Sequence, residues 1–454
     1  MGIVSAAPKR LRSLLLPAVA LGASMAIACI PSFGNAQDLS TAWQQAAASS
    51  PALAQARAQL EAQQAGRAIA RSALLPHLQA GASGGVNTAH VTGFGPLDIS
   101  TGYHSDSFSA SLTESVFDGQ AKMAVKQSDS RIRASQAALV YVEQSLALAV
   151  TQAYFNVLRA QADQRVAQQQ TRLLENIHAE TLASLHVGAG DIISVREVEA
   201  QLDAARSDLI VATNAVTIAK DRLEELTHQP VGTLRDLTAL EPRGPQPDTD
   251  GPWIDAAMHN QPRLLQVRAE WTESKQQVEF AKRAWWPTLT FNGYGQHSAG
   301  TLLPPMAIDQ LGASLSLSVP IYQGGRINAR IRQAKAFSKA TRAQVDSMQD
   351  QIRLETRTAF LELQNSVQQF HAAQQAVRSA QTSLDATRKG FEIGSRSIID
   401  LLTATTQLAS AQRNYSLALY TQLVARVQLK AAAGVLSPDD IQAINTLLIA
   451  APSH

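Results

Sequence analysis

The chain has 454 residues, a formal net charge of +2 and a single Cys. The near-neutral charge gives no basis for a nucleic-acid surface, and one Cys excludes an intrachain disulfide framework and a Cys-based zinc site. A mean hydropathy of −0.08 excludes a polytopic helical membrane protein, which needs several apolar runs of about 20 residues. It does not exclude a β-barrel, whose alternating strands average to neutral hydropathy.

Residues 1–36 have the pattern of a secretory signal peptide. A basic start precedes an apolar stretch, and small residues lie just before a cut after Ala36. We therefore predict that the mature chain begins at Gln37. Two alternatives stay open, which are lipidation of Cys29 and retention of the apolar stretch as a membrane helix.

The rest of the chain is a duplication with a shift of about 206 residues. The matching segments are 75–76 with 286–287, 116–119 with 321–324, 153–157 with 359–363, 187–189 with 393–395, and 199–206 with 405–412. Five matches in one order indicate two structural repeats. We place the repeats at residues 37–240 and 253–436, with a linker at 241–252 and a C-terminal segment at 437–454.

Each repeat is expected to hold a helix of middling length, two short strands, a very long helix, a Gly turn and a second long helix. Residues 107–113 and 311–319 alternate apolar and hydroxyl side chains, and this period of two is typical of strands. Partner strands are predicted to begin at Pro76 and Pro287. The hydroxyl face fits a barrel lumen, with a soluble sandwich as the alternative. The predicted loops are the Gly/Pro-rich stretches 87–106 and 297–309.

Two runs, residues 119–188 and 325–389, contain no Pro and no internal Gly. About 69 residues at 1.5 Å each make a helix of ~100 Å, which no globular domain of this size buries. Asp118 is placed to cap the first run. Shorter return helices are predicted at residues 191–228 and 397–434. These features favour coiled-coil-like packing through small side chains.

Trp285 and Trp286 lie just before the first strand of the second repeat. An aromatic pair at this place is typical of a membrane-interface anchor, and packing of both rings at a helix end is the alternative. Four strands per chain cannot close a membrane barrel, and an open edge is not tolerated in lipid, so several chains must share the barrel. Three chains give twelve strands, and the strand count alone also permits four chains. Helices of ~100 Å exceed a bilayer of about 30 Å, which favours a conduit across an aqueous compartment.

From about Leu39 to Leu447, and most closely at residues 320–326 and 390–408, the chain resembles the TolC family of outer-membrane efflux and type I secretion channels. The resemblance implies an α plus membrane β fold. This is a trimeric, 12-stranded outer-membrane β-barrel continuous with a 12-helix periplasmic α-barrel, with four strands and two long helical hairpins per chain. It also implies a cell outer membrane location, a periplasmic adaptor (membrane fusion) protein, and an inner-membrane transporter of ABC, RND or MFS type.

The resemblance further implies a gate near the second tip turn. The family's Asp ring at the closed aperture corresponds to Asp400, and its second ring corresponds to Thr403 and is therefore missing. The alternative is that Asp400 only caps a turn or pairs with Arg396.

The aromatic and Arg residues that hold the family's closed state correspond to Phe391 and Arg396. Their carboxylate partner corresponds to Ser194, which cannot form an ion pair, and Asp191 lies about one turn away as a substitute. Because Phe391 also lacks a hydroxyl group, we expect a closed state that is held more weakly.

The two tip turns correspond to the place where the family's adaptors dock. The candidate docking residues are Val187, Gly188, Ala189, Ile393, Gly394 and Ser395. The sequence has no G-x-S-x-G, P-loop or H-E-x-x-H motif, so we predict no catalytic residue, cofactor or metal site. The favoured function is a passive export channel. A periplasmic coiled-coil adaptor or scaffold and an outer-membrane enzyme are the rival hypotheses.

Overall fold

The computed structural model describes residues 37–94, 97–237, 241–300 and 307–449. The predicted signal peptide, with Cys29 and the cut after Ala36, lies outside the described residues. No helix in the described part of the chain is long and apolar enough to span a membrane.

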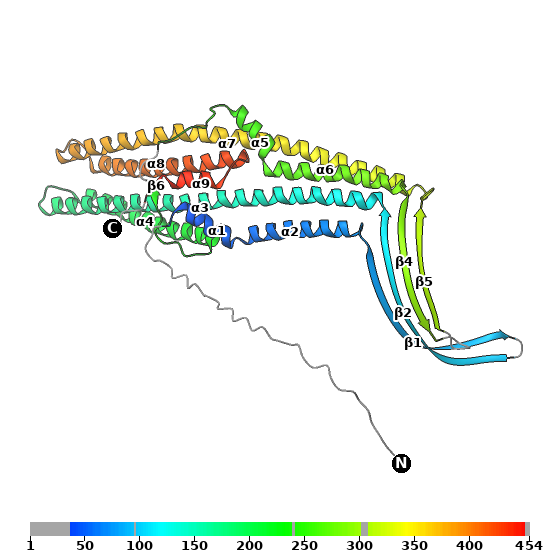
Figure 1. Ribbon diagram of the computed structural model, residues 1–454. Coiled ribbons are helices and arrows are strands. Elements are labelled where there is room, and N and C mark those ends of the chain that lie inside the picture. The colour runs from blue at the N-terminus through cyan, green and yellow to red at the C-terminus, as the bar shows by residue number, and fades with distance from the viewer. Residues whose placement is uncertain (1–36, 95–96, 238–240, 301–306, 450–454) are drawn as a thin grey trace, which may run out of the picture. The chain divides into compact units, whose positions relative to one another are not determined.

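The two repeats contain the same series of elements (Figure 1). The first repeat holds α1 (Leu39–Ser49), α2 (Pro51–Ser72), β1 (His77–Phe94), β2 (Leu97–Phe117), α3 (Gly119–His186) and α4 (Ile192–Thr227). The second holds α5 (Asp250–Asn260), α6 (Pro262–Lys282), β4 (Thr288–Ala299), β5 (Ala307–Ser318), α7 (Arg326–Glu392) and α8 (Ile398–Ala432). Three short elements that the sequence did not predict are β3 (Asp236–Leu237), α9 (Pro438–Asn445) and β6 (Leu448–Ile449).

The single middling helix expected at the start of each repeat is two helices. Ser50 and Gln261 adopt extended backbone, and Pro51 and Pro262 then begin the next helix at its first position. Pro has no N–H to donate and a φ already suited to a helix start, so it ends one helix and begins another.

The four main strands form one antiparallel sheet in the order β1-β2-β4-β5. The loop predictions were wrong, because strands cover most of residues 87–106 and also 297–299 and 307–309. The glycines there are compatible with the ladder, since its hydrogen bonds are made by the backbone. Pairing of β2 with β4 ends at Asp106 and Ala299, so the β1–β2 hairpin continues beyond β4 and β5 (Figure 1).

The register divides the sheet into the two faces that the alternation predicted. Leu78 is level with Leu112, Gly293 and Ala313 on one face. This face carries the exposed apolar side chains Leu78, Phe108, Leu311, Leu315 and Leu317. The next level on the other face consists of Gln79, Ser111, Tyr294 and Gly312.

The long helices are confirmed. Helix α3 has 68 residues and α7 has 67, and the return helices α4 and α8 have 36 and 35. Asp118 caps α3 as predicted, because its Oδ1 accepts hydrogen bonds from the N–H groups of Gln120 at 2.7 Å and Ala121 at 3.0 Å.

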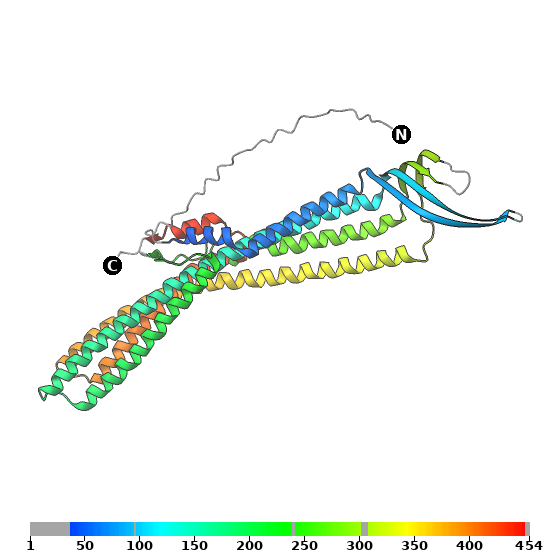
Figure 2. The same cartoon turned by 90° about the horizontal axis from the view of Figure 1, so that it is seen from below.

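The long helices lie side by side in a single layer (Figure 2). Away from the sheet, the order of contacts is α4, α3, α8 and α7, and toward the sheet it is α2, α3, α6 and α7. Helices α2 and α4 therefore lie at one border of the layer and α7 lies at the other. The sheet has matching borders, because β1 and β5 are its edge strands.

Trp286 packs at the junction of the sheet and the helices. Its ring stacks on Phe117 with 6.2 Å between centroids, and the Arg283 guanidinium lies 4.8 Å from its centre. Trp285 and Trp286 remain 38% and 45% exposed. The packing that we considered as the alternative to a membrane anchor is therefore present for Trp286, and both Trp residues stay partly at the surface.

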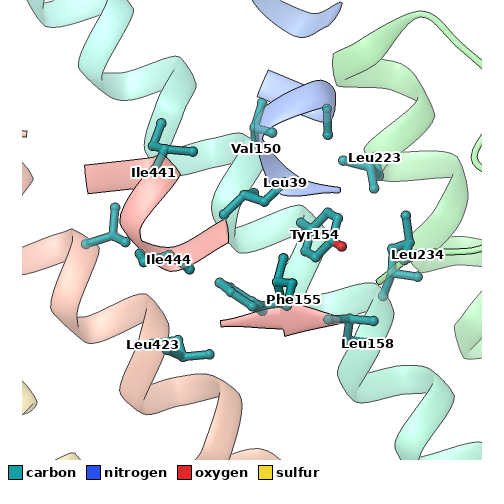
Figure 3. Close-up of a cluster of buried hydrophobic side chains, with 14 of the residues drawn as sticks. Leu39, Val150, Tyr154, Phe155, Leu158, Leu223, Leu234, Leu423, Ile441 and Ile444 are labelled. Atoms are coloured by element: carbon teal, nitrogen blue, oxygen red, sulfur yellow. The ribbon is translucent and has the colours of Figure 1, made fainter. Parts of the chain in front are cut away.

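A cluster of buried side chains, which we call the middle cluster, packs α1, α9 and β6 against the long helices (Figure 3). It includes Leu39, Tyr154, Phe155, Leu423 and Ile444. The Tyr154 hydroxyl donates to the carbonyl oxygens of Gln37 (3.2 Å) and Arg235 (2.8 Å). Burial raises the pKa of Tyr154 far above its ordinary value, so this donor stays protonated.

Asp38 and Asn445 tie the first helix to the last. The Asp38 side chain caps α1 by accepting from the Thr41 N–H at 2.8 Å, and Asn445 Nδ2 donates to its other oxygen at 3.1 Å. Asn445 Oδ1 in turn accepts from the Leu39 N–H at 3.1 Å. Burial alone would raise the pKa of Asp38, but hydrogen bonds from Thr41, Asn445 and Ser40 lower it to about 2.

Candidate functional site

The two hairpin tips have the same turn geometry. Gly188 and Gly394 adopt φ values of +74° and +75°, and a Cβ at either position would meet no atom within 4 Å. The requirement for Gly is therefore conformational, because side chains disfavour positive φ. The N–H of Ala189 donates to the Ser184 carbonyl at 2.8 Å, which closes the end of α3.

The second tip closes in the same way, with Ser395 N–H donating to the Gly390 carbonyl at 2.8 Å. Val187 and Ile393 precede the two glycines and are 79% and 81% exposed. Ile192, Ile193 and Ile399, in the first turns of α4 and α8, are also exposed. Each tip thus presents exposed apolar side chains, and Val187 and Ile393 are among the predicted docking positions.

The helices that leave the tips begin with different caps. Asp191 is the N-cap of α4, and its carboxylate accepts from the Ser194 N–H at 2.9 Å and from the Ser194 hydroxyl at 2.7 Å. At α8 the N-cap is Ser397, whose hydroxyl accepts from the Asp400 N–H at 3.2 Å. Asp400 Oδ2 accepts from the Ser397 N–H at 3.0 Å, which completes a capping box.

Both carboxyl groups have a pKa below the ordinary value for Asp. For Asp191 the main cause is the hydrogen bond from the Ser194 side chain, followed by the Ser194 backbone N–H. For Asp400 the main cause is the Ser397 backbone N–H, followed by the Ser397 hydroxyl, with a smaller contribution from the positive charge of Arg396. Both groups are therefore negatively charged at neutral pH.

Some of the predicted gate residues contact other side chains in the structure, and others do not form the contact that we expected. Phe391 packs against the buried cluster near the tips, which we call the tip cluster and which includes Leu174, Val198, Leu384, Leu401 and Leu408. Arg396 is exposed, and within the described residues its guanidinium forms no ion pair. Asp191 is bound to Ser194, so the substitute ion pair that we considered is not present within one chain.

Two contacts between the hairpins were not predicted. Arg388 of α7 lies 3.5 Å from the Glu180 carboxylate of α3, and Gln201 of α4 donates to the Thr406 hydroxyl of α8 at 3.4 Å. Nothing in the local sequence marks these residues, because a charged or amide side chain on a long helix is usually solvated.

A known protein family and several individual proteins match this chain over most of its length. The family model described as "Outer membrane efflux protein" matches residues 42–228 and 253–435, one segment in each repeat. The chain is 29% identical over 431 residues to outer membrane protein TolC of Escherichia coli K12, covering 92% of this chain and 86% of that protein. It is 27% identical over 389 residues to the alkaline protease secretion protein AprF of Pseudomonas aeruginosa, covering 83% and 80%.

Solved structures share the fold. The Campylobacter jejuni CmeC outer membrane channel matches with a TM-score of 0.78 at 18% identity, covering 90% of this chain and 89% of that chain. The open state of the Neisseria gonorrhoeae MtrE outer membrane channel matches with a TM-score of 0.71 at 19% identity, covering 88% and 90%. The chain therefore belongs to the outer membrane efflux protein family, and it is an outer-membrane channel protein with a large periplasmic part.

Proposed function

We propose that three copies of the chain form one closed channel, which passively conducts substrates of a tripartite efflux pump or a type I secretion system. In this arrangement β5 of one copy pairs with β1 of the next, so that twelve strands close a barrel in the outer membrane. Helix α7 of one copy meets α4 and α2 of the next, so that the long helices continue the channel through the periplasm.

The observation that carries this proposal is an unmatched pair of apolar positions. Within the chain, Phe155 of α3 is buried in the middle cluster and Val424 of α8 packs against that cluster. At the positions shifted by 206 residues, Leu361 of α7 is exposed by 45% and Ile218 of α4 by 55%. A second copy would cover these two side chains, which removes apolar surface from water.

Native mass spectrometry in mild detergent tests the assembly, together with the intact mass of the mature chain. We expect a trimer of chains that begin at Gln37. A stable monomer would contradict the shared barrel, and a chain that starts with a lipid-modified Cys29 would contradict the predicted cleavage.

The exposed tips are the proposed docking surface for a periplasmic adaptor, which in turn meets an inner-membrane transporter. Val187 and Ile393 offer exposed apolar side chains next to the glycine turns, and their removal from water on contact would favour docking. Residues 187–189 and 393–395 recur around a ring of three chains, so one adaptor type can bind repeatedly.

Asp400 is the proposed selectivity ring of the gate. Three copies bring three of these carboxylates toward one axis, where they attract cations and bind multivalent ones. Like charges at such a ring titrate as a coupled set. Its capping contact with Ser397 is compatible with this role, because that contact fixes the carboxylate at the start of α8.

A further inference from the structure

Four successive levels of the hydroxyl face receive a residue from each of β1, β2, β4 and β5, and we call this surface the lumen wall. Its members are every second residue of 77–83, 107–113, 292–298 and 308–314. None of these members is Asp, Glu, Lys or Arg, and Tyr294 is the only Phe, Tyr or Trp among them. The lumen wall therefore combines small or uncharged polar side chains with one large ring.

That ring occupies the place of a missing side chain on the neighbouring strand. Tyr294 of β4 lies directly opposite Gly312 of β5. A Cβ atom on Gly312 would lie 2.6 Å from Tyr294 Cζ and 2.7 Å from its Cε1 and Oη, whereas carbon atoms in contact are normally about 3.5–4.0 Å apart. Gly312 is also half-buried, while every other residue of β5 is exposed. The Tyr294 ring is thus where a side chain at position 312 would be.

The ring covers Gly312 with its face and not with its edge. Oη and Cε1 are both bonded to Cζ, and the three atoms are nearly equally far from the Cβ position. A point in the plane of the ring at this range could not be equally far from all three, so the Cβ position lies beneath the ring. Tyr294 therefore leans over β5 with one face toward the sheet, and its side chain stays 48% exposed. An aromatic ring over a strand glycine is a known way to cover exposed backbone.

The direction of this ring determines how much of a shared barrel stays open. In a membrane barrel the apolar face points to lipid and the polar face lines the lumen. Barrels of about 8 strands are filled by side chains, and those of about 16–18 strands enclose an aqueous channel. Three chains of four strands lie between these limits, so three large rings at one level affect the free width. Because each ring leans along the wall, the middle of the lumen is left open.

We propose that Tyr294 and Gly312 together set the width of the barrel lumen at their level, and with it the size of the solutes that pass. The backbone of Gly312 does not have a positive φ, so a substitution there acts through space alone. Any side chain at 312 would push the ring away from the wall and toward the channel axis. This inference rests on the shared barrel of the proposed function and adds to it the pair of residues that limits solute size.

Thiol labelling of intact cells tests the proposal, because a mature chain that begins at Gln37 has no Cys of its own. Ser316→Cys places a thiol on the hydroxyl face between Gly312 and the helices, and Ser107→Cys places one beyond the ring. The reagents are maleimide-linked polyethylene glycols of increasing length, added from outside. Gly312→Val should shift the largest polymer that labels Ser316→Cys to a smaller size, while labelling of Ser107→Cys stays unchanged.

Two further variants assign this shift to the ring. Tyr294→Ala added to Gly312→Val should restore the original size limit, because no ring is then displaced. Gly81→Val adds the same side chain to the next level of the lumen wall, where its Cβ would meet only Ser109 Oγ at 3.5 Å, and should leave the limit unchanged.

An unchanged limit in Gly312→Val, or a lowered limit that Tyr294→Ala does not restore, would overturn the proposal. Gly312→Ala replaces Gly312→Val if the latter does not reach the outer membrane, since the Cβ atom alone displaces the ring. If the smallest maleimide labels neither reporter thiol in assembled protein, the hydroxyl face does not line an open lumen. That result would contradict the barrel of the proposed function together with this inference, whereas a failure of Gly312→Val alone leaves the barrel intact.

Discussion

The two hairpin tips use the same pair of residue types in reversed order. In the first tip the Asp is at the N-cap (Asp191) and the Ser is three residues later (Ser194), and in the second tip Ser397 is the N-cap and Asp400 is three residues later. At the shift of 206 residues, Asp191 corresponds to Ser397 and Ser194 corresponds to Asp400. Both orders satisfy the free N–H groups at the helix start.

What differs is which position carries the Asp. The two Asp positions are three residues apart, which corresponds to about 4.5 Å along a helix, but the Asp191 carboxylate accepts from the Ser194 N–H and the Asp400 carboxylate accepts from the Ser397 N–H. The two halves therefore keep the same turn and the same pair of capping residue types, while the Asp stands at a different position in each. The following substitutions test whether the two tips differ in docking, in ion selection and in the stability of the helix that follows.

The largest effect is expected from Gly394→Val. A β-branched side chain at a φ of +75° is strained by roughly 1–2 kcal/mol or more, so the exposed turn must change shape. Export should be lost while trimers still reach the outer membrane, as measured by substrate secretion and by fractionation.

Gly188→Val provides the comparison between the tips, and Gly232→Val is the control, since a Cβ there meets open space at an ordinary φ. Full export in Gly394→Val would show that docking lies outside the second tip. Loss of export in the control variant would show that the assay reports folding instead of docking.

The next effect concerns ion selection. Asp400→Ala should abolish most of the block by a trivalent cation added from the periplasmic side and should lower cation selectivity in planar bilayers, because Thr403 supplies no second ring. Asp191→Ala removes the other tip carboxylate and should change the block much less. Equal loss of block in both variants would assign the cation site to both tips and contradict the single ring.

A double substitution sharpens the comparison by giving the first tip the order of the second. Asp191→Ser with Ser194→Asp keeps the cap but moves the carboxylate to the third position. We expect normal assembly and a stronger trivalent-cation block, by a factor of a few, because three further carboxylates then occupy the position equivalent to Asp400. An unchanged block would mean that α4 does not face the axis at this level.

The smallest effect is on local stability. Ser397→Ala removes one cap and should destabilise the start of α8 by about 1 kcal/mol, seen as faster hydrogen exchange in its first turn. Ser395→Ala is the control, because Ser395 only donates to the Gly390 carbonyl. No change in exchange for Ser397→Ala would show that the Asp400 contact alone holds the cap.

The pH dependence of the same exchange follows from Asp400. Its pKa is lowered in the folded chain, so its contribution to the cap is present at neutral pH and is lost as the pH falls through that lowered value. The same holds for Asp191 at α4. Exchange at both helix starts should therefore increase only in acid, below the ordinary range for Asp.

Much of this architecture could be predicted because its signals are local. A long run without Pro or Gly allows a continuous helix, and the tip glycines mark where each run ends. The alternation of Leu and Ser in residues 311–319 defines the two faces of β5, whatever it pairs with. Such features depend on neighbours in sequence, which are visible without coordinates.

The remainder depends on partners that are distant in sequence. Residues 87–94 and 97–106 contain turn-forming residues, yet they continue two strands because β1 and β2 supply each other with backbone hydrogen bonds. The short pairing of β3 with β6 likewise has no local signal.

The contact between Asp38 and Asn445 also has a consequence for the order of folding. These residues are separated by 407 positions, so the middle cluster cannot close until nearly the whole chain has been released into the compartment where it folds. Contacts of such high sequence separation form late and slowly. Until then the apolar faces of the strands and helices stay open to aggregation, for longer than in a protein whose core closes locally.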